Sequence, residues 1–490
     1  ALPLLEDLYT DAPQNTAFYR KLKQTYESIK RYDDALQLVD DRIDSAPTVS
    51  LLAEKARLLY QKGEVDAAND TWDRAVALAP SRPQTYRTVY NVLAEVRHFR
   101  KAIAVLREGR DALNRPGAFR TELAQLYGLD GQFEAAMQEY VALLSEAPGR
   151  LNYVRNQLQT FVEQGQGLEA SIQVLQQTVQ ETPLNEAYRE LLAWLYTERD
   201  DYTAAFDEYR ALDRLGERQG QILFRFAQQA ADAQRYGVAP RACEAIQEQH
   251  PASTVAPKAQ KLLGDFYRRW ARQGADSTST AEDSARYARA RAAYKSFLQN
   301  NPQHSDHTEA LLRLGTLEID VYRALDQAQE ALDQLVSNYS DTEAADEGQY
   351  HRGRIAVLRD SLDRARLLFS RLAASAQSSD FADLAQYELA LLHFYRGQFD
   401  AAMARATSIS ENPSADVAND AIELKTLLQE ARGPDSSDTA LRTFARARLS
   451  QRQRAHGPAL SMLDTLLQQH PRHPLADDAR FRQGDLHLAR

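Results

Sequence analysis

Small and large apolar residues recur along the first half of the chain in a fixed register. A small residue is followed four positions later by a larger apolar one, as in Ala35 and Val39 or Ala136 and Tyr140. A separation of four places both side chains on one face of an α-helix. The small member returns every 33 to 35 residues, at Ala1, Ala35, Ala68, Ala102, Ala136, Ser171, Ala205 and Ala239. This regularity predicts an internal repeat built from helices.

Prolines indicate where these repeats end. A proline often stands twelve positions after the small residue, at Pro13, Pro47, Pro80, Pro148, Pro183 and Pro251. Proline stops a helix because it lacks an N–H donor and clashes with the preceding turn. The pattern therefore predicts two helices per repeat: a first helix, and a second helix that carries the small residue and ends before the proline.

The register continues beyond residue 251 with longer steps of 37 to 57 residues. The small positions are then Ala290, Ala328, Ala365, Ala402 and Ala459, and the first helices are expected to carry Gly264, Gly315 and Gly353. The first long step contains a polar stretch near 274–283 that reads as a flexible loop. The last contains an extra amphipathic helix at 417–431 and a linker at 433–437.

These shifts in period predict three regions. A regular 34-residue array spans 1–251, a longer-period array with the polar insertion spans 252–416, and the extra helix with terminal repeats spans 417–490. Ala1 stands at the small position of a second helix, and 477–490 reads as a first helix without its partner. We therefore expect the chain to be a stretch of a longer protein.

Two stretches of the repeat resemble the tetratricopeptide repeat (TPR) family. One is Leu123-Ala124-x-x-Tyr127, followed by Phe133, Ala136, Tyr140 and Pro148; the other is Leu192-Ala193-x-x-Tyr196, followed by Tyr202, Ala205 and Tyr209. The resemblance implies an all-α fold, a right-handed α-solenoid of about twelve helix-turn-helix repeats. A Tyr-x-x-Phe-Leu-x-x-Asn-Pro run that ends at Pro302 is also similar to the longer repeats of bacterial cell-envelope TPR proteins.

Composition narrows the classes of function. The formal net charge of −10 argues against broad binding to nucleic acid or to an anionic membrane, since both need clustered cations. One cysteine, Cys243, excludes an internal disulfide framework, and its register position predicts a core residue. The longest apolar runs, at 191–196 and 389–395, are too short to span a bilayer.

Candidate catalytic and metal-binding groups are few. The sequence has no glycine-rich phosphate loop, nucleophile elbow or zincin motif. His304 and His307, with Asp306 between them, form the best metal candidate, but a zinc site needs four ligands and a solvated loop is the favoured interpretation. The basic run Arg442, Arg446, Arg448, Arg452 and Arg454 is expected to be a solvated helix face. We predict no enzyme activity, no cofactor and no metal.

The TPR resemblance implies that first helices line a concave groove, which binds peptides or helices of partner proteins. Mapping the family's groove positions onto this register gives Arg20, Arg57, Tyr60, Arg87, Asn91, Tyr153, Asn156, Trp194, Phe224, Arg225, Tyr350, Arg354 and Tyr387, with Arg268 and Phe394 as further candidates. The chaperone-binding carboxylate clamp of the family is not reproduced, because Tyr153 and Gln157 stand where it needs two cations.

The sequence thus predicts a non-catalytic scaffold or adaptor for protein partners. The alternative is an accessory or regulatory subunit of a bacterial cell-envelope assembly or secretion complex. A periplasmic or envelope location is favoured over the cytoplasm, while the partner, the pathway and the oligomeric state stay open.

Overall fold

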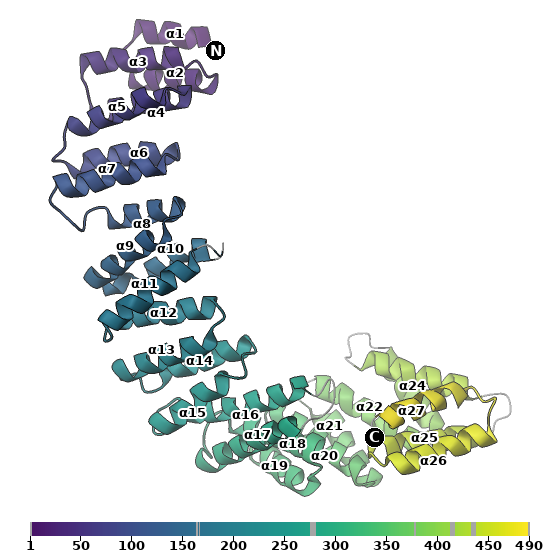
Figure 1. The fold of residues 1–490 in the computed structure, drawn as a ribbon. Coiled ribbons are helices and arrows are strands. Elements are labelled where there is room, and N and C mark those ends of the chain that lie inside the picture. Colours follow the sequence, from purple (N-terminus) through teal and green to yellow (C-terminus); the bar gives the residue numbers. More distant parts are fainter. Residues whose placement is uncertain are drawn as a thin grey trace. The chain divides into compact units, whose positions relative to one another are not determined.

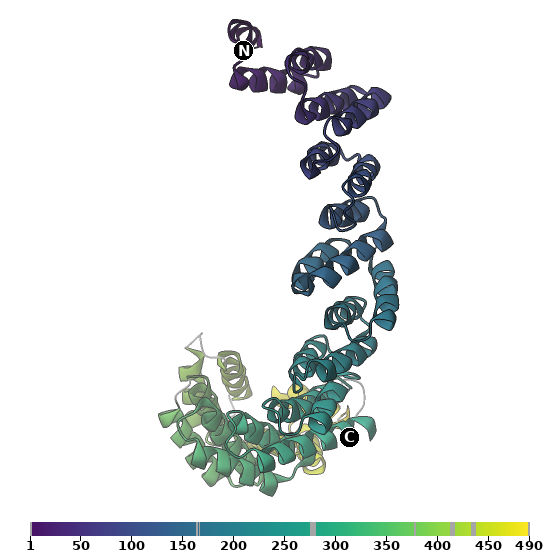
Figure 2. The same ribbon diagram turned by 90° about the vertical axis from the view of Figure 1, so that its left-hand side faces the viewer.

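The computed structural model is built of α-helices joined by short connections (Figure 1). It describes residues 2–162, 165, 167–274, 281–376, 379–411, 417–432 and 438–488. The chain divides into two compact units, Ala1–Phe226 (unit 1) and Ala227–Arg490 (unit 2). Within each unit, helices that follow one another in the sequence lie side by side, as the colour gradient makes visible in both views (Figures 1 and 2).

Unit 1 holds a succession of short helices of similar length. They are α1 (Leu2–Asp11), α2 (Thr16–Ser28), α3 (Tyr32–Ser45), α4 (Val49–Lys62), α5 (Val65–Ala77), α6 (Pro83–Glu95), α7 (Phe99–Ala112), α8 (Arg120–Leu129), α9 (Phe133–Glu146), the 3-10 turn η1 (Pro148–Arg150), α10 (Leu151–Val162), α11 (Leu168–Glu181), α12 (Glu186–Glu198) and α13 (Tyr202–Leu215). Helix α14 (Gln221–Asp232) spans the division between the units.

Unit 2 includes longer helices and one π-helical turn. They are α15 (Ala239–Gln249), α16 (Ala256–Gly274), α17 (Ala281–Asn300), α18 (His307–Leu317), the π turn η2 (Glu318–Tyr322), α19 (Leu325–Asn338), α20 (Glu343–Leu358), α21 (Leu362–Ser375), α22 (Ser379–Tyr395), α23 (Phe399–Ser410), α24 (Ala418–Ala431), α25 (Thr439–Arg452), α26 (His456–Gln469) and α27 (Leu475–Leu488). The extra helix predicted at 417–431 is confirmed as α24. The linker 433–437 and most of the polar insertion lie outside the described residues.

Burial of the small register positions confirms the predicted repeat. Pairs such as α4 with α5, α12 with α13 and α20 with α21 pack directly against each other, each an even-numbered first helix and the second helix that follows. On the second helices, the small residues have no exposed surface at Ala35, Ala68, Ala102, Ala136, Ser171, Ala205, Ala239, Ala290, Ala328, Ala365, Ala402 and Ala459. Small side chains are needed there because two helix backbones approach closely. The fold is an all-α solenoid.

Glycines on the first helices of unit 2 serve the same close approach. A Cβ atom added to Gly264 would lie 2.7 Å from the Tyr294 ring, and one added to Gly353 would lie 2.4 Å from the Phe369 ring. Both rings are fully buried and stand at the large positions of the register. Glycine is therefore required by packing at these positions, as the sequence pattern predicted.

Helix starts follow local capping chemistry. The Thr48 hydroxyl accepts a hydrogen bond from the Leu51 N–H at the start of α4, at 3.2 Å. The Thr342 hydroxyl accepts one from the Ala345 N–H at the start of α20, also at 3.2 Å. Each cap satisfies one of the N–H groups that lack a partner in the first turn. The two units therefore contain the same N-cap at equivalent first helices.

The C-terminal end of α25 ties unit 2 together over long sequence distances. We call Arg452, Gln453 and Arg454 the α25 clasp. Arg452 donates two hydrogen bonds to the Glu388 carboxylate of α22, at 2.6 and 2.8 Å. Gln453 donates to the Val357 carbonyl of α20 at 3.1 Å, and Arg454 donates to the Asp320 carbonyl of η2 at 3.3 Å. These contacts join residues 64, 96 and 134 positions apart.

The clasp corrects one prediction. The basic run from Arg442 was expected to form a solvated face, which is wrong for Arg452. The Glu388 carboxylate that Arg452 neutralises belongs to a residue that is only 4% exposed. A carboxylate buried to that degree needs a cation and good hydrogen bonds. No sequence pattern relates the two members of this pair, because they are 64 residues apart.

Candidate protein-binding surface

The predicted groove residues all lie on first helices, but their exposure differs widely. Five are exposed: Arg20, Arg87, Asn91, Asn156 and Arg225. Six are half-buried: Tyr60, Tyr153, Phe224, Tyr350, Arg354 and Tyr387. Two are buried: Arg57 and Trp194, which are 8% and 7% exposed. Their membership of one binding surface stays a prediction, and the exposed five are the members most accessible to a partner.

A series of side-chain contacts joins the first helices of neighbouring repeats in unit 1, from α2 to α12, and we call this series the ladder. Arg57 on α4 donates to Glu27 on α2 at 2.9 Å, and Arg87 on α6 donates to Glu122 on α8 at 3.0 Å. The partners are 30 and 35 residues apart, which is one repeat. Sequence reasoning found the two arginines but not their pairing with these carboxylates. Opposite charges spaced by one repeat are the sequence signal that could have identified these pairs.

The ladder continues through α8, α10 and α12. The Gln125 amide of α8 donates to the Gln157 side chain of α10 at 3.0 Å and to the Tyr153 hydroxyl at 3.3 Å. The Arg155 guanidinium of α10 lies 5.3 Å from the ring centroid of Trp194 on α12, a cation–π distance. Side chains of successive first helices are thus held in fixed positions relative to each other.

Burial and pairing set the electrostatics of the ladder. Burial acts to raise the pKa of Glu122, but hydrogen bonds from its own backbone N–H, from Thr121 and from Arg87 outweigh burial and lower it. Burial lowers the pKa of Lys23, whose ammonium lies beside Glu27 and Glu54. The charges on this face are therefore largely matched within the chain, and a partner must compete with or extend these pairs.

Tyr60 points between the helices of its repeat. Its ring stacks on His98 with centroids 5.0 Å apart and lies 5.8 Å from Trp72 of α5. Trp72 is fully buried. Tyr60 is thus mainly part of the packing between first and second helices, and its side chain is half-buried.

The predicted residues of unit 2 are engaged by the unit's own side chains. The Tyr350 hydroxyl donates to Glu388 at 3.2 Å, next to the Arg452 guanidinium of the clasp. Arg354 donates to the Asp320 carboxylate at 2.9 Å. Burial raises the pKa of Tyr387, which is half-buried beside Val417 and Ala418. In unit 2, much of the predicted surface is therefore occupied from within.

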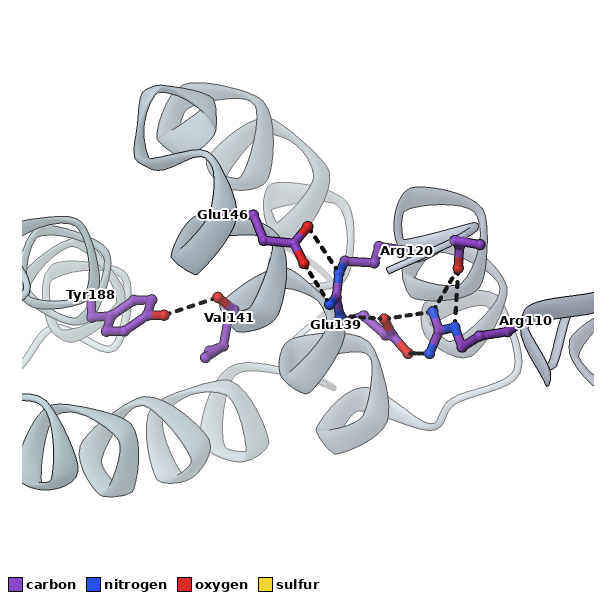
Figure 3. A network of polar contacts seen from close by, with 7 residues as sticks. Arg110, Arg120, Glu139, Val141, Glu146 and Tyr188 are labelled. Carbon is purple, nitrogen blue, oxygen red and sulfur yellow. Dashed lines mark hydrogen bonds and ion pairs between the residues drawn. The ribbon is translucent and has the colours of Figure 1, made fainter. Parts of the chain in front are cut away.

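A further charged network, seen in Figure 3, lies on the second helices α7 and α9. Arg110 donates to both oxygens of Glu139, at 2.7 and 3.0 Å, and to the Ala118 carbonyl of the α7–α8 connection. Arg120 pairs with Glu146 at 2.8 Å and with Glu139 at 3.6 Å. Two arginines and two glutamates balance each other, so the network fixes the connection that leads into α8.

The candidate reactive groups are buried or bonded to other residues of the chain. Cys243 is fully buried, and burial raises the pKa of its thiol. The His304 ring nitrogen accepts a hydrogen bond from the Asp306 N–H at 3.1 Å, as in a turn, and the His307 ring lies against Tyr339. No group of three or more His, Cys, Asp or Glu side chains is placed to hold a metal ion among the residues that the structure describes.

The helices of the described part of the chain differ from membrane-spanning helices. None of the described helices combines the length and the apolar character that crossing a lipid bilayer requires.

No protein-family model and no curated protein sequence matches the chain. Similar solved structures include a tetratricopeptide repeat protein from Parabacteroides merdae, with 15% identity and a TM-score of 0.35 over 54% of this chain and 97% of that one. Yeast Tom70 has 11% identity and a TM-score of 0.32, over 85% and 96%. Naa15/Naa10 bound to HypK-THB has 14% identity and a TM-score of 0.24, over 96% and 78%.

The chain's own geometry defines its fold. Helices pair in sequence order, the small register positions are fully buried, and the repeat period matches the TPR pattern. The chain is an α-helical solenoid of tetratricopeptide-like repeats.

Proposed function

We propose that the chain is a non-catalytic scaffold that binds peptide or helical segments of partner proteins along its first helices. The observation that carries the proposal is the ladder of unit 1, in which the exposed Arg87 lies between the buried Arg57 and Trp194 along the series of first helices. Arginine and aromatic side chains dominate the energetics of protein interfaces. A surface that holds them at one-repeat spacing suits an extended or helical segment that contacts several repeats.

The buried state of the one thiol and the turn contacts of the two candidate histidines support a role without chemistry. Cys243 has no exposed surface for a substrate, and His304 is bonded within its own turn. A scaffold needs neither group to be reactive. Copurification of a metal or organic cofactor, measured by elemental analysis and absorbance of pure protein, contradicts this part of the proposal.

The experiment is a pull-down from the native source, read by quantitative mass spectrometry. The test variant combines Arg87→Ala, Asn91→Ala and Asn156→Ala, three exposed residues of first helices. The control combines Arg100→Ala and Arg107→Ala, exposed residues of the second helix α7. We expect the test variant to lose most of the captured partner while the control keeps it. Equal capture by both removes the first-helix surface of unit 1 as the binding site.

Association with a cell envelope stays a proposal, carried by the Tyr-x-x-Phe-Leu-x-x-Asn-Pro run. In the structure this run covers the end of α17, where Tyr294 and Phe297 are fully buried core residues. Fractionation of the native source, followed by immunodetection, tests it: recovery with soluble cytoplasmic markers contradicts an envelope location.

A further inference from the structure

An arginine-rich pocket opens in unit 2, between α16, α17, α18 and η2. Its volume is about 310 Å³, and its wall includes Arg268, Arg272, Tyr287, Thr316, Asp320 and Val321. Arg272 is exposed and Arg268 is half-buried, one helical turn apart on α16. The pocket thus brings two guanidinium groups, one phenol and one hydroxyl together around a single carboxylate.

Three further arginines lie around Asp320 outside the pocket wall. Arg354 of α20 donates to the Asp320 carboxylate at 2.9 Å, and Arg454 of the clasp donates to the Asp320 carbonyl at 3.3 Å. Arg323 directly follows η2 and lies close to Arg354 and Arg454. Burial is the main cause that lowers the pKa of its guanidinium. The positive charges of Arg454 and Arg354 lower this pKa further, and the negative charge of Asp320 opposes them.

The positive charges at this place exceed the negative ones. Five arginines gather around Asp320, whose carboxylate already accepts from Arg354. The next carboxylate along the Tyr287 wall, Asp283, is held by Arg286 at 2.7 Å. This differs from the ladder of unit 1, where Arg57 and Arg87 each pair with a carboxylate one repeat away. Like charges held together are unfavourable unless an anion joins them.

We propose that this pocket binds a carboxylate side chain of an acidic peptide segment from a partner protein. The proposal rests on the proposed scaffold function and names the partner chemistry for unit 2. A guanidinium matches a carboxylate with two parallel hydrogen bonds, and several converging guanidiniums match an acidic run. Val321, which is 37% exposed, and Tyr287 supply an apolar wall for the neighbouring residue of the ligand.

The net charge of the chain favours a short peptide over a nucleic acid as the ligand of this pocket. The chain carries a formal net charge of −10, which repels a long polyanion outside the pocket. A short segment that places one or two acidic side chains in the pocket avoids most of that repulsion. A phosphate group on a peptide has related chemistry, and the experiment separates it from a carboxylate.

The test uses the full chain and fluorescence anisotropy. The probe is a fluorescein-labelled peptide of alternating glutamate and leucine; the matched peptide has glutamine in place of glutamate. The variants are Arg268→Gln and Arg272→Gln, both in the pocket wall, and the control is Arg269→Gln, an exposed arginine of α16 outside the pocket wall. Each substitution removes one positive charge, so a change in overall charge alone affects all three equally.

We expect the glutamate peptide to bind, the glutamine peptide not to bind, and each pocket variant to weaken binding about tenfold. The control should stay within a factor of about two of the wild type. Equal loss in the control and in the pocket variants, or equal binding of both peptides, overturns the proposal. A phosphoserine peptide that binds more tightly than the glutamate peptide overturns the carboxylate assignment in favour of phosphate.

The result also separates this inference from the scaffold function. If the acidic peptide does not bind while the unit 1 variants still lose their partner in the pull-down, the pocket proposal fails and the scaffold proposal stands. If the unit 1 variants keep their partner and the peptide does not bind, both fail.

Discussion

The two units build similar helix pairs and connect them differently. In unit 1, the ladder contacts join residues 28 to 39 positions apart, about one repeat, so that each first helix contacts its neighbour in the next repeat. Unit 2 also has contacts of one-repeat spacing, as between Arg354 and Asp320, but its α25 clasp in addition joins residues 64 to 134 positions apart and links α25 to α22, α20 and η2. A nearest-neighbour array and a unit closed by its own C-terminal helices thus occur in one chain.

This difference between the units determines which side chains are accessible to a partner. A repeat array held by nearest neighbours leaves a row of half-exposed side chains along its first helices. A clasp fills such a row from within, as with Tyr350 and Glu388, and leaves only a pocket at its rim. Unit 1 is accordingly the candidate for extended contact, and unit 2 for recognition of a small charged group.

The largest expected effect comes from breaking the clasp. Arg452→Gln leaves the Glu388 carboxylate buried without its counter-ion, and we expect unit 2 to lose about 3 kcal/mol in free energy of unfolding. Urea denaturation followed by circular dichroism measures it. Arg446→Gln, at an exposed position of the same helix, is the control and should change the free energy by less than about 0.5 kcal/mol. Equal effects contradict a structural role for the clasp.

Overpacking a first helix of unit 2 is the next largest effect. Gly353→Ala places a Cβ 2.4 Å from the buried Phe369 ring, and we expect a net loss of about 2 kcal/mol after the gain in helix propensity. Gly484→Ala on α27 is the matched control, since no atom lies within 4 Å of its added Cβ. Its urea midpoint should stay or rise. If the urea midpoint of Gly353→Ala is also unchanged, the result contradicts close packing of α20 against α21.

Removing the same N-cap in each unit compares the units directly. Thr48→Ala and Thr342→Ala each lose one capping hydrogen bond of 3.2 Å, worth about 1 kcal/mol. Amide hydrogen exchange should show the Thr48 effect mainly in α4 and its neighbours, and the Thr342 effect across α18 to α25. Local effects in both units contradict closure of unit 2.

The smallest expected effect lies in the exposed part of the ladder. The Arg87 side chain is 48% exposed and pairs with Glu122, so Arg87→Gln should cost only about 0.5 kcal/mol, and less in high salt. Thermal unfolding at two salt concentrations measures it. A loss of several kcal/mol means that the ladder holds unit 1 together, which excludes Arg87 as a residue free to engage a partner.

The repeat register predicted most of the fold because small residues are needed wherever two helices approach closely. It placed Ala136 and Ala365 in the core, and Gly353 against a large side chain. It did not predict the Arg452–Glu388 pair, because the 64 intervening residues carry no pattern that relates the two. The predicted binding residues were placed on first helices correctly, but burial of Trp194 and pairing of Arg57 depend on neighbouring repeats.

Native-state hydrogen exchange of the whole chain in increasing urea tests the central contrast most directly. The exchange free energies of α18, α20, α22 and α25 should converge on one value, because the clasp makes these helices open together. Those of α2, α4, α6 and α8 should stay graded, since each depends on its nearest neighbours. Graded opening in unit 2 together with a single common value in unit 1 contradicts the account.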